Sequence, residues 1–107
     1  MDDKFYVPQL TAKRLKEAGY PVEQDAPITY HEAVDWLENN WIQFNMYRDR
    51  WTKSYSVFIN YPNGGLAWKD GKLHSSSSRE QALNECILEA IEIVKRRQRL
   101  LQQKQQQ

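Results

Sequence analysis

The amino-acid sequence predicts an α+β domain with two short N-terminal helices, a three-stranded antiparallel meander and a long C-terminal helix packed on one sheet face. Apolar residues follow the period of a helix in residues 28–40 and 79–94, and the period of a strand between residues 41 and 61. The 107 residues suit one domain. We expect residues 1–98 to form it, and residues 99–107 to be a Gln-rich tail that is frayed helix or disordered.

The first helix is expected within residues 10–21, because both of its ends are marked. Thr11 is the expected N-cap, since its hydroxyl can accept a hydrogen bond from a free backbone N–H. Gly19 suits the left-handed residue that follows a helix, and Pro21 prevents continuation. The helix is short, so it needs tertiary contacts to persist.

The second helix is expected within residues 28–40, and it opens with the pattern of a capping box. Thr29 can bond the backbone of Glu32, and the Glu32 side chain can reach back to Thr29. The spacing of the apolar residues after this cap predicts one buried face. That face consists of Tyr30, Ala33, Val34 and Leu37.

Three strands are expected next, in residues 41–47, 54–61 and 66–69. Apolar and polar residues alternate along the first two, as they do on a sheet that is covered on one side. Pro62–Gly65 gives a strong turn signal before the third strand. The first strand leaves a mixed aromatic and polar face open to solvent, and this face carries Trp41, Gln43, Asn45 and Tyr47.

The last helix is expected to start near Arg79, with the four serines at 75–78 serving as linker and cap. One continuous apolar stripe then follows, made by Leu83, Cys86, Ile87, Ala90, Ile91 and Val94. Its burial contributes on the order of 10 kcal/mol before the entropy of ordering the chain is subtracted. This helix is therefore predicted to hold the domain together.

Composition narrows the classes of function. The net charge is +1, which gives no global electrostatic attraction to nucleic acid or to an anionic membrane. The single cysteine, Cys86, allows no internal disulfide, and the sequence has no apolar run long enough for a membrane span. A reducing, cytoplasmic location is the expectation.

No constellation of residues predicts an enzyme, a cofactor or a metal site. His31, Asp35 and Glu38 have a spacing that can converge on a metal, but a solvated helix face is the better interpretation. His74 has no orienting partner visible in the sequence, which a general base would need. Cys86 lies within the apolar stripe, where a thiol packs as a small apolar group.

Two binding functions are considered. The first is contact with a protein partner or with a second copy of the chain, because Trp and Tyr are common interface anchors. The candidate anchors are Trp41, Tyr47, Trp51 and Trp68. The alternative that these rings only cover the exposed sheet of a monomer stays open.

The second function is nucleic-acid binding, because the order of helix, three strands and helix resembles a double-stranded-RNA-binding domain. That resemblance implies a Lys-rich cluster at the start of the last helix, where this chain has Ser77, Ser78, Arg79 and Glu80 instead. The candidate phosphate-binding residues are Arg48, Arg50, Lys53, Lys95, Arg96, Arg97 and Arg99. This function is the alternative to protein binding.

Three motifs give a further resemblance. The stretches "LKEAGYP", "ITYHEAVDWLENN" and "SREQALNECILEAIEIV" occur in this order. They resemble a set of small bacterial proteins, often found in prophages and mobile elements, that have no known activity. The resemblance implies a phage or mobile-element origin and no known activity or catalytic residue. We therefore expect a small interaction module that acts by binding rather than by chemistry. The matching positions look architectural, and they are Leu15, Gly19, Pro21, Tyr30, Asp35, Trp36 and Leu37.

Overall fold

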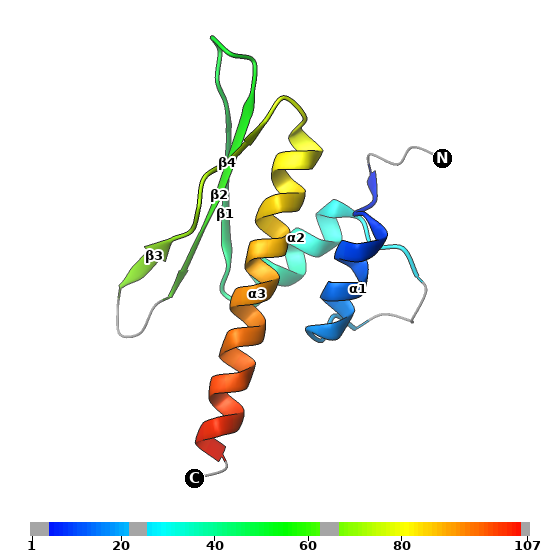
Figure 1. Cartoon of the computed structure of the whole chain (residues 1–107), viewed down its shortest axis with the longest axis vertical. Coiled ribbons are helices and arrows are strands. Elements are labelled where there is room, and N and C mark those ends of the chain that lie inside the picture. Colours follow the sequence, from blue (N-terminus) through cyan, green and yellow to red (C-terminus); the bar gives the residue numbers. More distant parts are fainter. Residues whose placement is uncertain (1–4, 22–25, 63–66, 106–107) are drawn as a thin grey trace.

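The computed structural model describes residues 5–21, 26–62 and 67–105, and it confirms the α+β class (Figure 1). Within these residues the elements follow in the order α1 (Gln9–Glu17), α2 (Tyr30–Glu38), β1 (Gln43–Arg48), β2 (Tyr55–Pro62), β3 (Trp68–Asp70), β4 (His74–Ser76) and α3 (Arg79–Gln105). The turn expected after Pro62 falls on residues 63–66, which lie outside the described residues.

β2 is the central strand of an antiparallel sheet. It pairs with β1 along one side, from Gln43↔Asn60 to Arg48↔Tyr55. On its other side it pairs first with β4, through Val57↔His74, and then with β3, through Asn60↔Asp70.

The predicted third strand corresponds to β3, and β4 is a fourth strand that was not predicted. The last pair between β2 and β4 is Val57↔His74, and the first pair between β2 and β3 is Asn60↔Asp70. Between these two pairs, two residues of β2 (58 and 59) face three residues (71–73) of the opposite segment. The extra residue is a β-bulge, which interrupts the pairing. The sequence prediction missed β4 because its residues, His74, Ser75 and Ser76, have no apolar alternation and were interpreted as a linker.

Gly71 allows the sheet to pass close to α3 at this bulge. Its N–H donates a hydrogen bond of 2.7 Å to the Ile59 carbonyl. A Cβ atom at this position would lie 2.7 Å from Ile59 Cγ1 and 2.7 Å from Glu89 Oε2. A side chain here would therefore push the bulge away from both β2 and α3.

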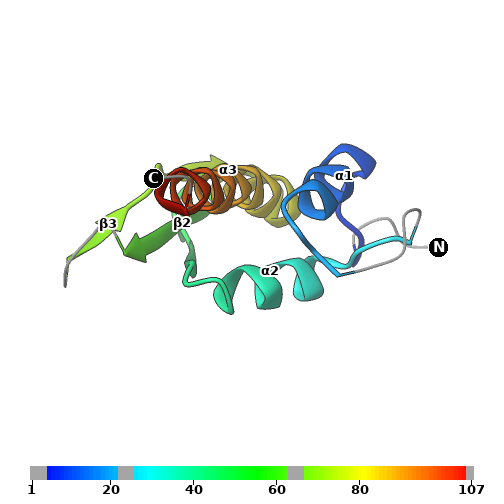
Figure 2. The same ribbon diagram turned by 90° about the horizontal axis from the view of Figure 1, so that it is seen from below.

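The helices lie on one side of the sheet, with α3 between the strands and α1 (Figures 1 and 2). α3 contacts β2 and β4 on one side and α1 and α2 on the other. Its predicted stripe is buried, and Ile93 outside the stripe is buried as well. The fully buried side chains around it include Leu15, Leu37, Ile42, Val57 and Ile59, so every layer contributes to one core.

α1 begins three residues earlier than predicted, at Gln9, with Pro8 instead of Thr11 as its N-cap residue. Thr11 is therefore not a cap. It lies inside the helix, buried, and its hydroxyl donates a hydrogen bond of 2.6 Å to Asn84 Oδ1 of α3. The predicted end is confirmed, because Gly19 has a φ of +112° and follows the last turn in a Schellman motif.

The capping box of α2 is confirmed. The Glu32 N–H donates to Thr29 Oγ1 at 3.1 Å, and the Thr29 N–H donates to Glu32 Oε1 at 3.1 Å. The Thr29 hydroxyl also donates to Glu32 Oε1 at 2.7 Å. This bond and the bond from the Thr29 N–H lower the pKa of the Glu32 carboxyl, because both stabilise its charged form. Within the described residues, no helix is both long and apolar enough to cross a lipid bilayer.

Cys86 provides a test of the packing of α3. Its side chain is fully buried, its thiol donates to the Val57 carbonyl at 3.1 Å, and burial raises its pKa to about 12. We expect native protein at about pH 8 to react with iodoacetamide at least about a thousandfold more slowly than unfolded protein, because only the unfolded chain presents a reactive thiol. Rapid alkylation of a chain that keeps its native circular dichroism would contradict this packing.

Candidate functional site

The side chains of the sheet that point away from α3 form one surface, here called the open face. Cross-strand partners share a side, and alternate residues of a strand change sides. Since Val57 and Ile59 are buried on the helix side, the even-numbered residues of β2 lie on the other. The open face therefore carries Gln43, Asn45, Tyr47, Ser56, Phe58, Asn60, Trp68, Asp70 and Ser75.

A chain of hydrogen bonds crosses the open face from β1 to β3. Asn45 Nδ2 donates to Asn60 Oδ1 at 2.5 Å, and Asn60 Nδ2 donates in turn to Asp70 Oδ1. On the same face, where β2 pairs with β4, the hydroxyls of Ser56 and Ser75 lie 2.9 Å apart. These bonds hold the polar side chains in fixed orientations, so the face is preorganised.

Aromatic side chains occupy the rest of the open face. Tyr47 and Phe58 meet edge to face, with ring centroids 6.4 Å apart and an interplanar angle of 70°. Tyr47 and Trp68 are each about half exposed. Large rings left in water on a sheet face are typical of interaction surfaces.

The charges on the two sides of the sheet differ in sign. Arg48 and Lys69 pair with Tyr55 and Tyr61, so they lie on the helix side, and the Arg48 guanidinium sits 5.5 Å from the centroid of the Tyr55 ring. On the open face, the charged residue among the described strand positions is an acid, Asp70. The open face is therefore aromatic and acidic.

A shallow hollow of about 230 Å³ lies at the end of the open face where β1 begins. Among the residues that the structure describes, its lining comprises Glu38, Trp41, Ile42, Gln43 and Trp68. Two tryptophans and one acidic residue thus line the same hollow. Trp41 is 68% exposed, so most of its ring is not needed by the core.

Trp41 has a strained backbone. Its φ is +68°, in the left-handed region that favours glycine. The Trp41 N–H donates to the Glu38 carbonyl at 3.2 Å and the Ile42 N–H donates to the Leu37 carbonyl at 3.1 Å, so Trp41 ends α2 where glycine is the usual residue. The strain places the indole beside the hollow.

Trp51 does not belong to the open face. It lies at the tip of the β1–β2 hairpin, where Asp49 Oδ1 accepts a hydrogen bond of 2.8 Å from its N–H. Its side chain is 94% exposed. The four candidate anchors are therefore divided: Tyr47 and Trp68 belong to the open face, Trp41 borders it at the hollow, and Trp51 lies apart from them.

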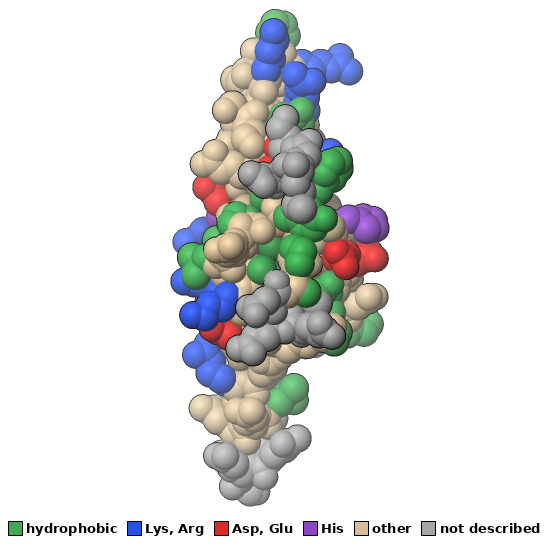
Figure 3. Space-filling view, turned by 90° about the vertical axis from the view of Figure 1, so that its right-hand side faces the viewer, with side chains coloured by type: hydrophobic (Ala, Val, Ile, Leu, Met, Phe, Trp, Pro, Cys, Tyr) green, Lys and Arg blue, Asp and Glu red, His purple; other side chains and the backbone are tan. Residues whose placement is uncertain are grey.

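The candidate phosphate-binding residues do not form one surface. Arg48, Arg50 and Lys53 surround the hairpin tip, where Lys and Arg side chains gather at the top of Figure 3. Residues 95–99 lie in the second half of α3, well below the hairpin tip in Figure 1, beside the ends of α1 and α2.

Two members of the second group also have partners inside the domain. Lys95 Nζ lies 3.3 Å from Glu17 Oε2, and Arg97 Nη1 donates to the Asn40 carbonyl at 2.5 Å. Burial lowers the pKa of Arg97, because the charged guanidinium is partly removed from water. These contacts tie α3 to α1 and to the end of α2, so this part of the helix serves the fold.

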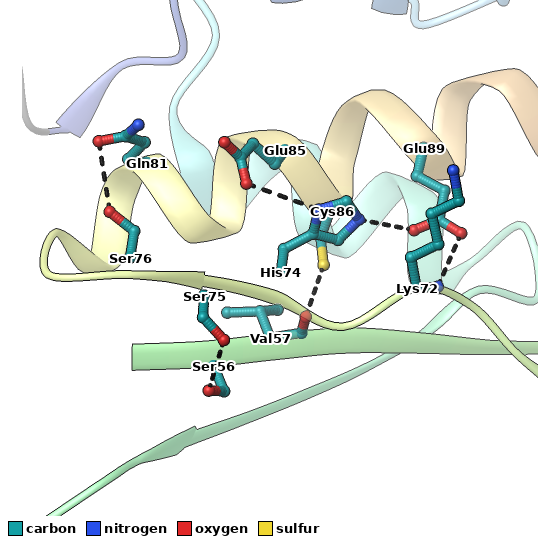
Figure 4. A network of polar contacts seen from close by, with 10 residues as sticks. All are labelled: Ser56, Val57, Lys72, His74, Ser75, Ser76, Gln81, Glu85, Cys86 and Glu89. Carbon is teal, nitrogen blue, oxygen red and sulfur yellow. Dashed lines mark hydrogen bonds and ion pairs between the residues drawn. The ribbon is translucent and has the colours of Figure 1, made fainter. Parts of the chain in front are cut away.

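His74 has partners that the sequence analysis did not detect (Figure 4). Its Nε2 lies 2.8 Å from Glu89 Oε1, and its Nδ1 lies 3.5 Å from Glu85 Oε2. Glu89 Oε2 also accepts a hydrogen bond of 3.1 Å from the Lys72 N–H. The expectation that His74 lacks a partner was wrong. The prediction missed β4, and the packing of β4 on α3 brings the carboxylates of Glu85 and Glu89 next to the His74 ring.

This cluster joins β4 to α3. The nearby Cys86 thiol, whose raised pKa keeps it protonated at neutral pH, donates to a carbonyl inside the core. Across the described ranges, no three His, Cys, Asp or Glu side chains are placed to hold a metal ion. The spaced trio His31, Asp35 and Glu38 is exposed along α2.

Comparison of the chain with protein-family models, with curated proteins and with solved structures gives no match.

Replacing Glu89 tests the contact between β4 and α3. We expect Glu89→Ala to lower the free energy of unfolding by about 1–3 kcal/mol, because the His74 ring and the Lys72 N–H both lose their acceptor. Glu92→Ala, at an exposed position on the same helix, is the matched control and should change stability by less than about 0.5 kcal/mol. Equal effects in urea unfolding would show that the cluster contributes nothing specific.

Replacing Trp41 tests its strain. We expect Trp41→Gly to raise the free energy of unfolding by about 1 kcal/mol, because glycine adopts a positive φ without the clash of a Cβ atom. Trp68→Gly removes another exposed indole from an ordinary strand position, and it should lower stability by about 0.5–1 kcal/mol. Thermal unfolding distinguishes the two, and a loss of similar size in both variants would contradict the strain.

Proposed function

We propose that this protein is a non-enzymatic interaction module that binds a partner protein on its open face. The observation that supports this is an uncovered sheet face with exposed aromatic rings and an acidic charge. The described helices all lie on the opposite side of the sheet. Exposed Trp and Tyr side chains anchor partners because they bury much apolar area at a small cost in entropy.

The chemistry of the partner follows from the charges of this face. The bases Arg48 and Lys69 are directed to the helix side, while Asp70 remains on the open face and Glu38 borders it. A partner that presents Lys or Arg side chains among apolar ones is therefore complementary to it. The hydrogen bonds from Asn45 to Asp70 hold the polar groups in place, which limits the entropy lost on binding.

We also propose that the protein acts in the bacterial cytoplasm. The resemblance to small proteins of prophages and mobile elements supports a role in the bacterial cytoplasm. The one cysteine of the chain, Cys86, is free and buried, which suits a reducing compartment.

A peptide-display selection tests protein binding without knowledge of the natural partner. Immobilised protein is expected to enrich peptides that contain basic and apolar residues. The double variant Tyr47→Ser/Trp68→Ser should weaken the selected peptides by about tenfold or more, since each ring acts as an anchor. Leu10→Ser, which removes an exposed apolar residue from α1, is the control that should leave affinity unchanged.

Two results would overturn the proposal. One is that no peptide is enriched, and the other is that the selected peptides bind the double variant as tightly as the native chain. Sedimentation of the protein alone adds a further comparison. A dimer that dissociates in the Tyr47→Ser/Trp68→Ser variant would identify the partner as a second copy of the chain, still bound through the open face.

The hairpin tip supports nucleic-acid binding as a second candidate function. Arg48, Arg50 and Lys53 are close to Trp51 in the sequence, and the Trp51 side chain is 94% exposed, so that its indole can stack on a base. Contact with about three phosphates predicts a slope near −3 in a plot of log affinity against log salt for duplex RNA or DNA. Affinity weaker than about micromolar at low salt would exclude this candidate.

A further inference from the structure

We propose that the hollow bordered by Trp41 and Trp68 receives one cationic side chain of the partner, a Lys ammonium or an Arg guanidinium. This inference rests on the proposed function, because the cation is taken to belong to the protein that docks on the open face. It goes further in naming the group that is recognised and the residues that recognise it.

The lining of the hollow has the chemistry of a cation site. The face of an indole carries negative electrostatic potential, and Trp is the strongest of the aromatic residues in attracting cations. Two tryptophans, Trp41 and Trp68, line the same hollow as the acidic residue Glu38. Gln43 adds a side-chain amide, whose oxygen can accept a hydrogen bond from an ammonium or guanidinium group.

The end of α2 adds to this attraction. Glu38 is the last residue of the helix, and the C-terminal end of a helix carries partial negative charge. The chain already provides one example of this preference, because Arg97 donates to the Asn40 carbonyl just beyond Glu38. Arg97 is not part of the lining of the hollow.

The strain at Trp41 gives a separate reason to assign a binding role to this place. A residue with a positive φ other than glycine costs stability, and such residues are concentrated at binding and active sites. Glycine at position 41 would end α2 more easily, but it would remove one wall of the hollow. The indole is mostly exposed, so core packing does not account for it.

Small cations test the hollow separately from the partner. Tetramethylammonium and guanidinium are titrated into the whole chain, with tert-butanol as the neutral control, while the indole N–H signals are followed by NMR. The signals of Trp41 and Trp68 should shift with both cations and not with the alcohol. The Trp36 and Trp51 signals serve as internal references that should stay in place.

Two variants sharpen the measurement. Glu38→Gln keeps the shape of the hollow and removes its charge, so it should weaken cation binding by about two- to fivefold. Trp41→Gly should abolish the cation-dependent shift of Trp68 while the fold is retained. Equal shifts with the cations and with tert-butanol, or no shift with any probe, would overturn the assignment.

Peptides from the display selection then test the source of the cation. Replacing their Lys by norleucine or their Arg by citrulline should weaken binding to the native chain and have little effect on binding to Glu38→Gln. If peptides bind the open face and these replacements change nothing, the inference fails while the proposed function stands. If small cations bind but no peptide is enriched, the hollow is supported as a cation site and the proposed function fails.

Discussion

The packing of α3 against β2 is the contact on which the rest of the structure depends. Val57 and Ile59 of β2 and Cys86, Ile87 and Ile91 of α3 are all fully buried. The other elements attach to this pair: β4 through His74 and Glu89, α1 through Thr11 and Asn84, and α2 through Arg97 and Asn40. One helix can cover only one face of a sheet, so the same packing that forms the core leaves the opposite face available for binding.

The two faces of the sheet therefore differ in burial. On the helix side the side chains are buried and contribute to stability. On the open side Tyr47, Trp68 and Asp70 contribute little to the core, and Trp41 is held there at a cost in backbone strain. We propose that the stability given up at this exposed aromatic residue serves binding rather than folding.

The parts of this structure that were predicted from the sequence depend on neighbours along the chain. The capping box of Thr29, the end of α1 at Gly19 and the apolar stripe of α3 are all local patterns. The contact of His74 with Glu89 spans 15 residues and depends on a bulge that local patterns do not reveal. Trp41 and Lys53 adopt a positive φ although neither is glycine. The direction of the Trp41 ring and the position of Trp51 away from the open face were therefore not predictable from the sequence.

The most direct test of this account is NMR with a neutral, soluble paramagnetic probe, which broadens the signals of atoms that water can reach. The account predicts strong broadening for the side chains of Gln43, Tyr47 and Trp68, and none for the methyl groups of Val57, Ile87 and Ile91. Broadening of the Ile87 and Ile91 methyl groups would contradict the packing of α3 on the sheet. Equal protection of both sets in a chain shown to be monomeric would contradict the open face.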